Sequence, residues 1–199
     1  MTDGPAPAPG IRGEPPDQEL IRRFRQGDRD AFVTLMARHE TKVYNLAYRM
    51  LGRAEDARDA TQEAFLSCFR HLPAFRGDAA FSTWLHRIAV NACFDLLRRR
   101  PAATSLDQEI TEPAPAPDHA DQAAAAADVH RALLAIPPEF RAVLILHELQ
   151  DLPVEEIAAA LDVPVGTVKS RLHRGRVAMG RALAREPDRV PAPSKPPSP

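Results

Sequence analysis

The chain has 199 residues, 44% of them hydrophobic, and a formal net charge of −1 at pH 7. This length suffices for one or two compact domains with apolar cores, and the near-zero charge excludes a uniformly basic protein that binds nucleic acid through bulk charge alone. No run approaches the roughly 18 apolar residues of a membrane span, and the N-terminal MTDGPAPAPG does not resemble a secretory signal, so we expect a cytoplasmic protein without direct membrane insertion.

Most of the 20 prolines lie near the two ends of the chain and in its middle. Proline-rich stretches favour extended, solvated backbone and resist packing. They therefore divide the chain into two blocks that can fold and three segments that we expect not to. The expected boundaries are a disordered tail at 1–16, a folded block at 17–100, a flexible acidic Pro/Ala-rich linker at 101–125, a second folded block at 126–186 and a disordered tail at 187–199.

Apolar residues in the first block recur at three- and four-residue spacing, which predicts α-helices. Asp28 is placed to cap one of them, Gly52 to end it, and Pro73 to close the next. The expected helices cover about 18–26, 29–52, 53–72 and 82–100. On the last of these, Ile88, Ala89, Ala92, Cys93, Leu96 and Leu97 are predicted to pack inward.

The second block has the same spacing, with helices predicted at about 121–135, 138–149, 154–161 and 165–184. Phe140, Val143, Leu144, Leu146 and Leu149 form the expected core side of the second of these helices. The predicted fold class is all-α, with two small helical domains joined by a flexible acidic linker.

The spacing of titratable residues does not indicate a catalytic site or a metal site. Cys68 and Cys93 lie at apolar helical positions without a second ligand at metal spacing, so we expect both to be small core residues in a reducing compartment. The seven histidines are scattered, and clustered carboxylates are missing. We therefore predict no catalytic residue, no metal and no cofactor, and a protein that is not an enzyme.

The charges are unevenly distributed along the chain. Residues 101–130 contain six acidic residues and no Lys or Arg, whereas residues 167–185 contain six basic residues and no acid. The basic run falls within VEEIAAALDVPVGTVKSRLHRGR, which has the short helix, tight turn and second helix of a helix-turn-helix. Pro164 suits the first turn of that second helix.

On a helical wheel, Val168 and Leu172 set the buried side of that second helix, and polar residues occupy the opposite side. Hydroxyl and guanidinium groups can contact base edges and phosphates, and the N–H groups at a helix N-terminus suit a phosphate. The candidate DNA-contacting residues are Gly166, Thr167, Lys169, Ser170, Arg171, His173 and Arg174.

The helix at 82–100 carries a second polar row, which runs into the sequence Arg98, Arg99, Arg100. Aromatic residues precede this row, around a loop that contains Gly77. Aromatics beside a basic helix suit unpaired bases, which stack on them, although plain core packing is an equally good interpretation of the rings alone. The candidates are Phe75, Phe81, Trp84, Arg87, Asn91, Arg98 and Arg99.

The segment AEDARDATQEAFLSCFRHLPAFRGDAAFSTWLHRIAVNACFDLLRRR resembles region two of the extracytoplasmic-function sigma factors, group four of the sigma-70 family of RNA polymerase subunits. The segment IPPEFRAVLILHELQDLPVEEIAAALDVPVGTVKSRLHRGR resembles their region four. Pro153 departs from the pattern, because many relatives have a Ser or Thr cap there.

The resemblance implies a promoter-selecting subunit of RNA polymerase, which contacts the minus-ten element and melts it with the first block and contacts the minus-thirty-five element with the helix-turn-helix. It also implies a linker that threads into the polymerase, a stress or envelope-response regulon and, as partners, core RNA polymerase, promoter DNA and an anti-sigma factor. The positions implied for core-polymerase binding are Asp56, Asp59, Gln62, Glu63 and Phe65.

Two other functions compete with this one. A stand-alone helix-turn-helix regulator would need a dimerisation element, and the sequence shows neither heptads nor a sensor domain. A helical nuclease would need clustered carboxylates for a metal.

Overall fold

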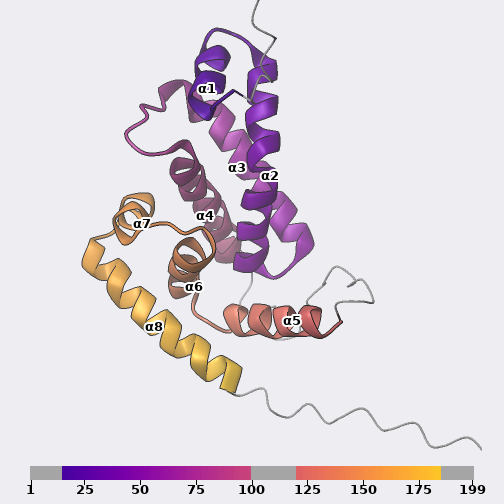
Figure 1. Ribbon diagram of the computed structural model, residues 1–199, viewed down its shortest axis with the longest axis vertical. Helices are drawn as coiled ribbons and strands as arrows, with labels where there is room; N and C mark the ends of the chain where they lie inside the picture. The colour runs from indigo at the N-terminus through magenta and orange to yellow at the C-terminus, as the bar shows by residue number, and fades with distance from the viewer. Residues whose placement is uncertain (1–14, 100–119, 185–199) are drawn as a thin grey trace, which may run out of the picture.

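The computed structural model describes residues 15–99 and 120–184, and these form helices and loops without any strand. Figure 1 shows two helical units, an N-terminal unit of α1 to α4 and a C-terminal unit of α5 to α8. The N-terminal helices are α1 (Asp17–Arg25), α2 (Arg29–Leu51), α3 (Ala54–His71), the 3₁₀ turn η1 (Leu72–Ala74) and α4 (Phe81–Arg99). The C-terminal helices are α5 (Ala120–Leu134), α6 (Pro138–Leu144), which continues as the π turn η4 (Ile145–Leu149), α7 (Val154–Leu161) and α8 (Val165–Ala184).

The predicted caps of α2 are confirmed. The Asp28 carboxylate accepts hydrogen bonds from the backbone N–H groups of Asp30 and Ala31, at 3.1 and 3.2 Å. These bonds satisfy two donors that the first turn of a helix leaves without partners. At the other end, Gly52 takes a left-handed conformation with φ of 81°, which costs little only for glycine.

The core of the N-terminal unit lies where α2, α3 and α4 pack against one another. Leu35, Leu46, Met50 and Leu85 are fully buried there. On α4 the buried set is Phe81, Thr83, Leu85, His86, Ala89, Val90, Ala92 and Cys93. The predicted Ala89, Ala92 and Cys93 are therefore confirmed, whereas Ile88, Leu96 and Leu97 are only half-buried.

In the C-terminal unit, α8 packs against both α6 and α7. A Cβ atom on Gly175 of α8 would approach the Leu144 side chain of α6 to 3.0 Å, so glycine permits this close crossing. The expectation that Leu149 is a core residue is wrong, since 45% of it is exposed. The reason is the π turn, because its wider winding rotates the end of the helix away from the apolar stripe.

The two units are packed together and share one continuous cluster of buried apolar residues. In Figure 1, α7 lies beside α4, and α5 crosses below the end of α2. The sequence predicted two joined domains but not this contact between them. Most of the predicted linker, most of the N-terminal tail, the whole C-terminal tail and Arg100 lie outside the described residues. Among the helices described, none is both long and apolar enough to cross a membrane.

Candidate nucleic-acid interface

The turn between α7 and α8 has the geometry of a helix-turn-helix. Asp162 ends α7 in a left-handed conformation, with φ of 53° and ψ of 48°, and the Val163 N–H donates to the Ala158 carbonyl at 3.1 Å. This pairing reverses the chain after α7 and satisfies one of its last carbonyls. No side chain caps the start of α7 at Pro153, as the departure from the family pattern led us to expect.

The first turns of α8 have one buried and one exposed side, as the helical wheel predicts. Val168, Leu172 and Gly175 are buried against the rest of the unit. The candidate residues Gly166, Lys169, Ser170, His173 and Arg174 are exposed, and Thr167 and Arg171 are half-buried. This helix therefore presents a polar and basic strip to solvent.

Two hydrogen bonds limit what this strip offers to DNA. The Thr167 N–H donates to the Pro164 carbonyl at 2.9 Å, so the expectation that this N–H is free for a phosphate is wrong. The Ser170 hydroxyl donates to the Thr167 carbonyl at 2.9 Å, which leaves its oxygen as an acceptor. The cationic groups of Lys169 and Arg174 are therefore the main exposed donors of the strip.

A second polar strip follows α4. Arg87, Asn91, Arg98 and Arg99 are all exposed. The Arg98 guanidinium forms an ion pair with Asp95, one turn earlier. Because both side chains are largely solvated, this pair is weak and its arginine can exchange the carboxylate for a phosphate.

Three aromatic rings cluster at the start of α4. The ring centroids of Phe75 and Trp84 lie 5.0 Å apart, those of Phe81 and Trp84 5.8 Å, and those of Phe75 and Phe81 5.9 Å. Phe75 and Trp84 are half-buried, whereas Phe81 is only 5% exposed and also packs on His39 of α2. Phe81 therefore supports the other two rings from below, and its own face is not available to a base in this arrangement.

The loop that precedes α4 is held at its start and turns at Gly77. The Arg25 guanidinium of α1 donates to the Phe75 carbonyl, and Gly77 turns the chain with φ of 81°. This loop and α4 border a pocket of about 300 Å³, which we call the α4 pocket. Its lining includes Phe75, Arg76, Gly77, Asp78, Trp84 and Arg87, together with Ala159 and Ala160 of α7.

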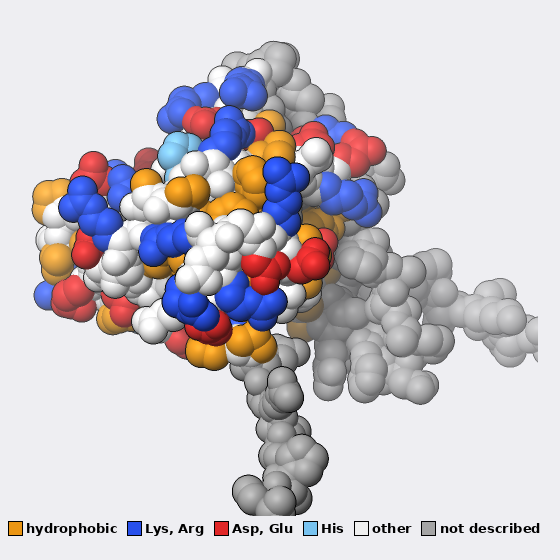
Figure 2. All heavy atoms as spheres, turned by 90° about the horizontal axis from the view of Figure 1, so that it is seen from above, with side chains coloured by type: hydrophobic (Ala, Val, Ile, Leu, Met, Phe, Trp, Pro, Cys, Tyr) orange, Lys and Arg blue, Asp and Glu red, His pale blue; other side chains and the backbone are white. Residues whose placement is uncertain are grey.

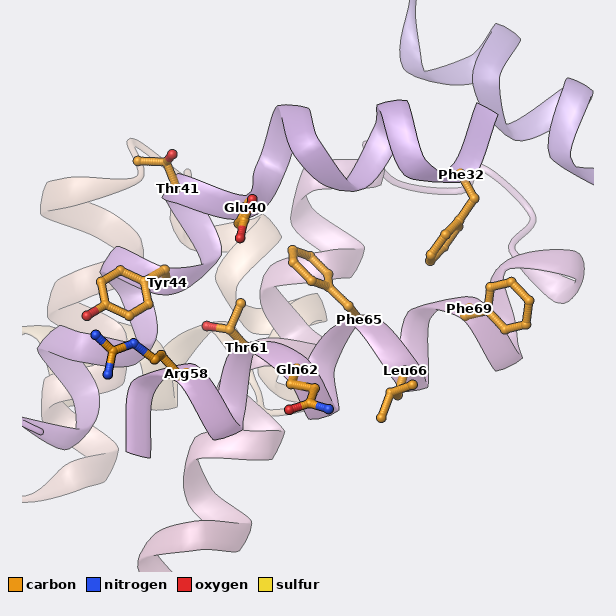
Figure 3. Close-up of a pocket in the computed structure, with 10 residues that line it drawn as sticks. All are labelled: Phe32, Glu40, Thr41, Tyr44, Arg58, Thr61, Gln62, Phe65, Leu66 and Phe69. Carbon is orange, nitrogen blue, oxygen red and sulfur yellow. The ribbon is translucent and has the colours of Figure 1, made fainter. Parts of the chain in front are cut away.

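A third candidate surface lies on α2 and α3, where Figure 3 shows a groove of about 900 Å³, called here the α3 groove. Gln62 and Phe65, both predicted from the sequence, line this groove with Leu66 and Phe69, which are 48% and 43% exposed. The remaining lining residues are Phe32, Glu40, Thr41, Tyr44, Arg58 and Thr61.

Acidic groups accompany the α3 groove. Asp59 and Glu63 are exposed on α3, and Asp56 is half-buried. Glu63 accepts a hydrogen bond from Arg70 at 3.1 Å, and both side chains are about 60% exposed. Solvated pairs of this kind contribute little to stability, so Glu63 can exchange Arg70 for a partner's cation.

The surface charge is mixed at the end of the molecule where α1 lies. Figure 2, which views the molecule from the end at which α1 lies, shows Lys and Arg side chains interspersed with Asp and Glu, and hydrophobic atoms exposed between them. Nucleic acid requires positive charge, which the exposed basic residues on α4 and α8 supply.

Both cysteines are 0% exposed, and burial raises the pKa of each thiol to about 12. The prediction that they are core residues is confirmed. His86 is likewise buried, and its pKa falls to about 4 through desolvation and, secondarily, through His39 and Lys42. Among the described residues, no group of three or more His, Cys, Asp or Glu side chains is placed to hold a metal ion.

Comparison with known families matches both units. Residues 35–102 match the model for sigma-70 region 2, and residues 126–179 match the model for sigma-70 region 4. The chain is 42% identical over 179 residues to the ECF RNA polymerase sigma factor SigM of Mycobacterium tuberculosis, which covers 90% of each chain.

The chain is an extracytoplasmic-function (ECF) sigma factor.

Other ECF sigma factors and a solved structure agree with this assignment. The sigma-E factor of Escherichia coli is 38% identical over 179 residues, or 82% of this chain and 92% of the relative. The structure of CnrH in complex with the cytosolic domain of CnrY matches with a TM-score of 0.65 and 26% identity, over 85% of this chain and 98% of CnrH. The resemblance to the ECF family and the all-α fold are thereby confirmed, and the stand-alone regulator is not favoured.

Sequence reasoning missed several residues of these surfaces. Arg25 lies 50 positions before the carbonyl that it holds, and no local pattern indicates that contact. Leu66 and Phe69 were detectable in principle, since α3 carries more apolar residues than one buried stripe requires.

Proposed function

We propose that this ECF sigma factor binds core RNA polymerase through the α3 groove and the neighbouring acidic residues Asp59 and Glu63, which we call the acidic rim. It contacts and melts the minus-ten element with α4 and the α4 pocket. It contacts the minus-thirty-five element with α8. The observation that carries this proposal is the presence of two separate exposed basic strips, on α4 and α8, in a chain whose net charge is −1. Such a distribution suits two DNA elements better than one continuous DNA surface.

For core polymerase, the α3 groove offers an apolar floor and an acidic rim. Leu66 and Phe69 would be covered by a partner helix, while Asp59, Gln62 and Glu63 would pair with its basic and polar residues. Phe65 lines the floor and Asp56 lies one turn before the rim. The resemblance to the ECF family implies the same five positions for core-polymerase binding, namely Asp56, Asp59, Gln62, Glu63 and Phe65.

For the minus-ten element, Trp84 and Phe75 offer ring faces beside the α4 pocket, and Arg87 lines the same pocket. A base that leaves the duplex gains about 1–3 kcal/mol by stacking on an aromatic ring. Asn91, Arg98 and Arg99 continue the strip towards the C-terminal end of α4, where they would contact the backbone and bases of the opened strand. Phe81 supports these rings from within the core.

For the minus-thirty-five element, α8 enters the major groove with Arg174 and Lys169 as its principal donors. Gly166 and Thr167 lie at the helix start, and Ser170, Arg171 and His173 complete the strip. Most of the acidic linker lies outside the described residues, and its threading through polymerase stays a prediction.

The remaining expectations complete the proposal. The protein acts in the cytoplasm as an initiation factor without catalytic residues of its own, in a stress or envelope-response regulon, and an anti-sigma factor controls it. In support of a protein regulator, CnrH was solved in complex with the cytosolic domain of CnrY.

Transcription by reconstituted enzyme tests the proposal. Genomic fragments retained by the mixture of this protein and core polymerase serve as templates for run-off transcription. We expect defined transcripts only when both are present. Equal transcription by core polymerase alone, or failure of the protein to bind core polymerase, would overturn the proposal.

A further inference from the structure

The loop between α3 and α4 has little backbone support of its own. It is exposed from Pro73 to Ala80 apart from Phe75, which is half-buried. The Phe75 N–H donates to the Leu72 carbonyl at 3.2 Å, but across the described residues no hydrogen bond between backbone groups involves residues 76–79. A loop of this kind samples many conformations unless side chains hold it, because ordering each of its residues costs conformational entropy.

One side chain from another helix holds the start of this loop. The Arg25 guanidinium, at the end of α1, donates to the Phe75 carbonyl, and the same nitrogen lies 3.5 Å from the Leu72 carbonyl oxygen. Figure 1 shows the loop beside α1. The Phe75 carbonyl belongs to the rigid peptide group that links Phe75 to Arg76. The bond therefore sets the direction in which the chain continues along the α4 pocket.

Arg25 differs from the neighbouring arginines of α1 in what it contacts. Arg22 forms an ion pair with Glu19, and Arg23 forms one with Asp28. Within the part of the chain that the structure describes, Arg25 forms no ion pair, and its hydrogen bonds go to loop carbonyls. This arginine therefore links α1 to the loop, whereas the other two contact side chains close to them in the sequence.

The helix that carries Arg25 is firmly anchored. Phe24 packs on Phe32 of α2 and on Phe69 of α3, with ring centroids 5.2 and 5.4 Å apart. Leu20, one turn earlier, is only 1% exposed. Because the backbone of α1 is already ordered by this packing, Arg25 can hold a carbonyl of the loop at a smaller entropic cost than a donor on another loop could.

The held residue is one that the α4 pocket needs. The Phe75 ring lies 5.0 Å from the Trp84 ring, centroid to centroid, and both residues line the pocket, whereas Arg25 does not. A base gains most from stacking when the rings are already in place, because no ordering then remains to be done on binding. Arg25 can therefore influence the pocket without touching DNA.

We propose that Arg25 is a positioning residue for the α4 pocket. Its guanidinium holds the Phe75 carbonyl and thereby keeps the Phe75 ring against Trp84, in the arrangement that receives one unpaired base of the minus-ten strand. The proposal rests on the proposed function of the α4 pocket. Arginine suits this role because its planar guanidinium presents several N–H donors in fixed directions, whereas lysine has one flexible ammonium group.

The first measurement uses the free, full-length protein. Trp84 is the only tryptophan of the chain, so acrylamide quenching of its fluorescence reports on the loop that packs against it. Arg25→Met removes the donors but keeps a long side chain, Arg25→Lys keeps the charge, and Arg22→Met removes an equal charge from the same exposed helix end. We expect clearly stronger quenching for Arg25→Met than for the wild type or Arg22→Met, with Arg25→Lys between them.

The second measurement uses each protein in complex with core polymerase. The probe is fluorescein-labelled single-stranded DNA that spans the minus-ten element of a template transcribed by the wild-type enzyme, together with copies that lack one base at a time. For the wild type, an abasic site at the position that enters the pocket should weaken binding.

We expect Arg25→Met to reduce this abasic penalty about three- to tenfold, as the loss of one hydrogen bond implies. Its affinity for the abasic strand itself should stay within about twofold of the wild-type value. Arg25→Lys should reduce the penalty by a smaller factor, and Arg22→Met should keep it in full. Arg25→Lys also provides the comparison if Arg25→Met folds poorly.

Two results would overturn the role of Arg25. One is an equal loss of affinity for the intact and the abasic strands in Arg25→Met, which would make this arginine a phosphate contact or a general support of the fold. The other is an abasic penalty as large in Arg25→Met as in the wild type. A third result, no penalty at any position even for the wild type, would instead refute the proposed function of the α4 pocket, and the role of Arg25 with it.

Discussion

Arg141 of α6 donates a hydrogen bond across the boundary between the two units, to the backbone carbonyl of Met50 near the end of α2. Its guanidinium also donates to the carbonyls of Leu134 and Ile136, at 2.6 and 2.9 Å. These carbonyls lie at or just beyond the ends of two helices, where the helix dipole is negative and partners within the helix are lacking. A single buried cation thus satisfies backbone acceptors from both units.

Arg141→Met should therefore lower the free energy of unfolding by about 2–4 kcal/mol, because it leaves buried carbonyls without donors. Urea denaturation followed by circular dichroism measures this loss. Arg181→Met, on the exposed end of α8, is the control and should change stability by less than about 0.5 kcal/mol. Equal losses in the two variants would contradict the role assigned to Arg141.

A charged residue introduced into the α3 groove should weaken binding to core polymerase without lowering the stability of the fold. Leu66→Glu is expected to weaken binding to core polymerase about tenfold or more, since a partner helix would have to bury the carboxylate. Val33→Glu is the matched control, because Val33 is 64% exposed on α2 but does not line the groove. Affinity is measured by titrating labelled protein with core enzyme, and a similar loss in both variants would place the binding surface elsewhere.

The two basic strips should act on different promoter elements. Arg174→Ala is expected to lower run-off transcription mainly from templates with an intact minus-thirty-five element, by an amount that corresponds to about 1–3 kcal/mol. Asn91→Ala should instead impair selection and opening of the minus-ten element. Templates mutated in one element or the other distinguish these effects, and equal responses on both kinds of template would refute the division.

Acid should loosen the contact between the units through His130. Burial, followed by the charges of Arg49 and Arg141, lowers the pKa of this histidine from 6.5 to about 4 in the packed arrangement. Between these two values the separated units bind the proton and the packed units do not, so falling pH favours separation. Above pH 6.5 both forms are neutral and the effect disappears.

Small-angle scattering checks this expectation. The radius of gyration of the wild type should increase as the pH falls from neutral to about 5. His130→Phe keeps a ring for Tyr48 to stack on and removes the titrating group, so its radius should change less over the same range. Other titrating groups are common to both proteins, and identical pH profiles would rule out His130 as the cause.

The sequence predicted the helices closely because their signals are local. Asp28 and Gly52 bracket α2 by capping and by a left-handed turn, and the spacing of Val168 and Leu172 orients α8 correctly. The basic strip on α8 follows from that orientation alone. Local sequence signals were therefore sufficient to predict the helix-turn-helix.

Long-range packing accounts for what the sequence did not predict. Phe81 is buried and packs against His39 of another helix, and no pattern within α4 indicates that neighbour. The Met50–Arg141 bond joins residues 91 positions apart, and the Thr83–Glu156 bond joins residues 73 apart. Pairs of this kind follow from how complete helices pack, so the contact between the two units emerged only in three dimensions.

The burial of Cys68 and Cys93 also determines which signals the chain can sense. With a thiol pKa of about 12, each sulfur is almost wholly protonated near neutral pH, and only the thiolate reacts readily with peroxides or disulfides. These are the only two cysteines of the chain. The protein therefore lacks the exposed, reactive thiol on which a thiol-based oxidant sensor depends.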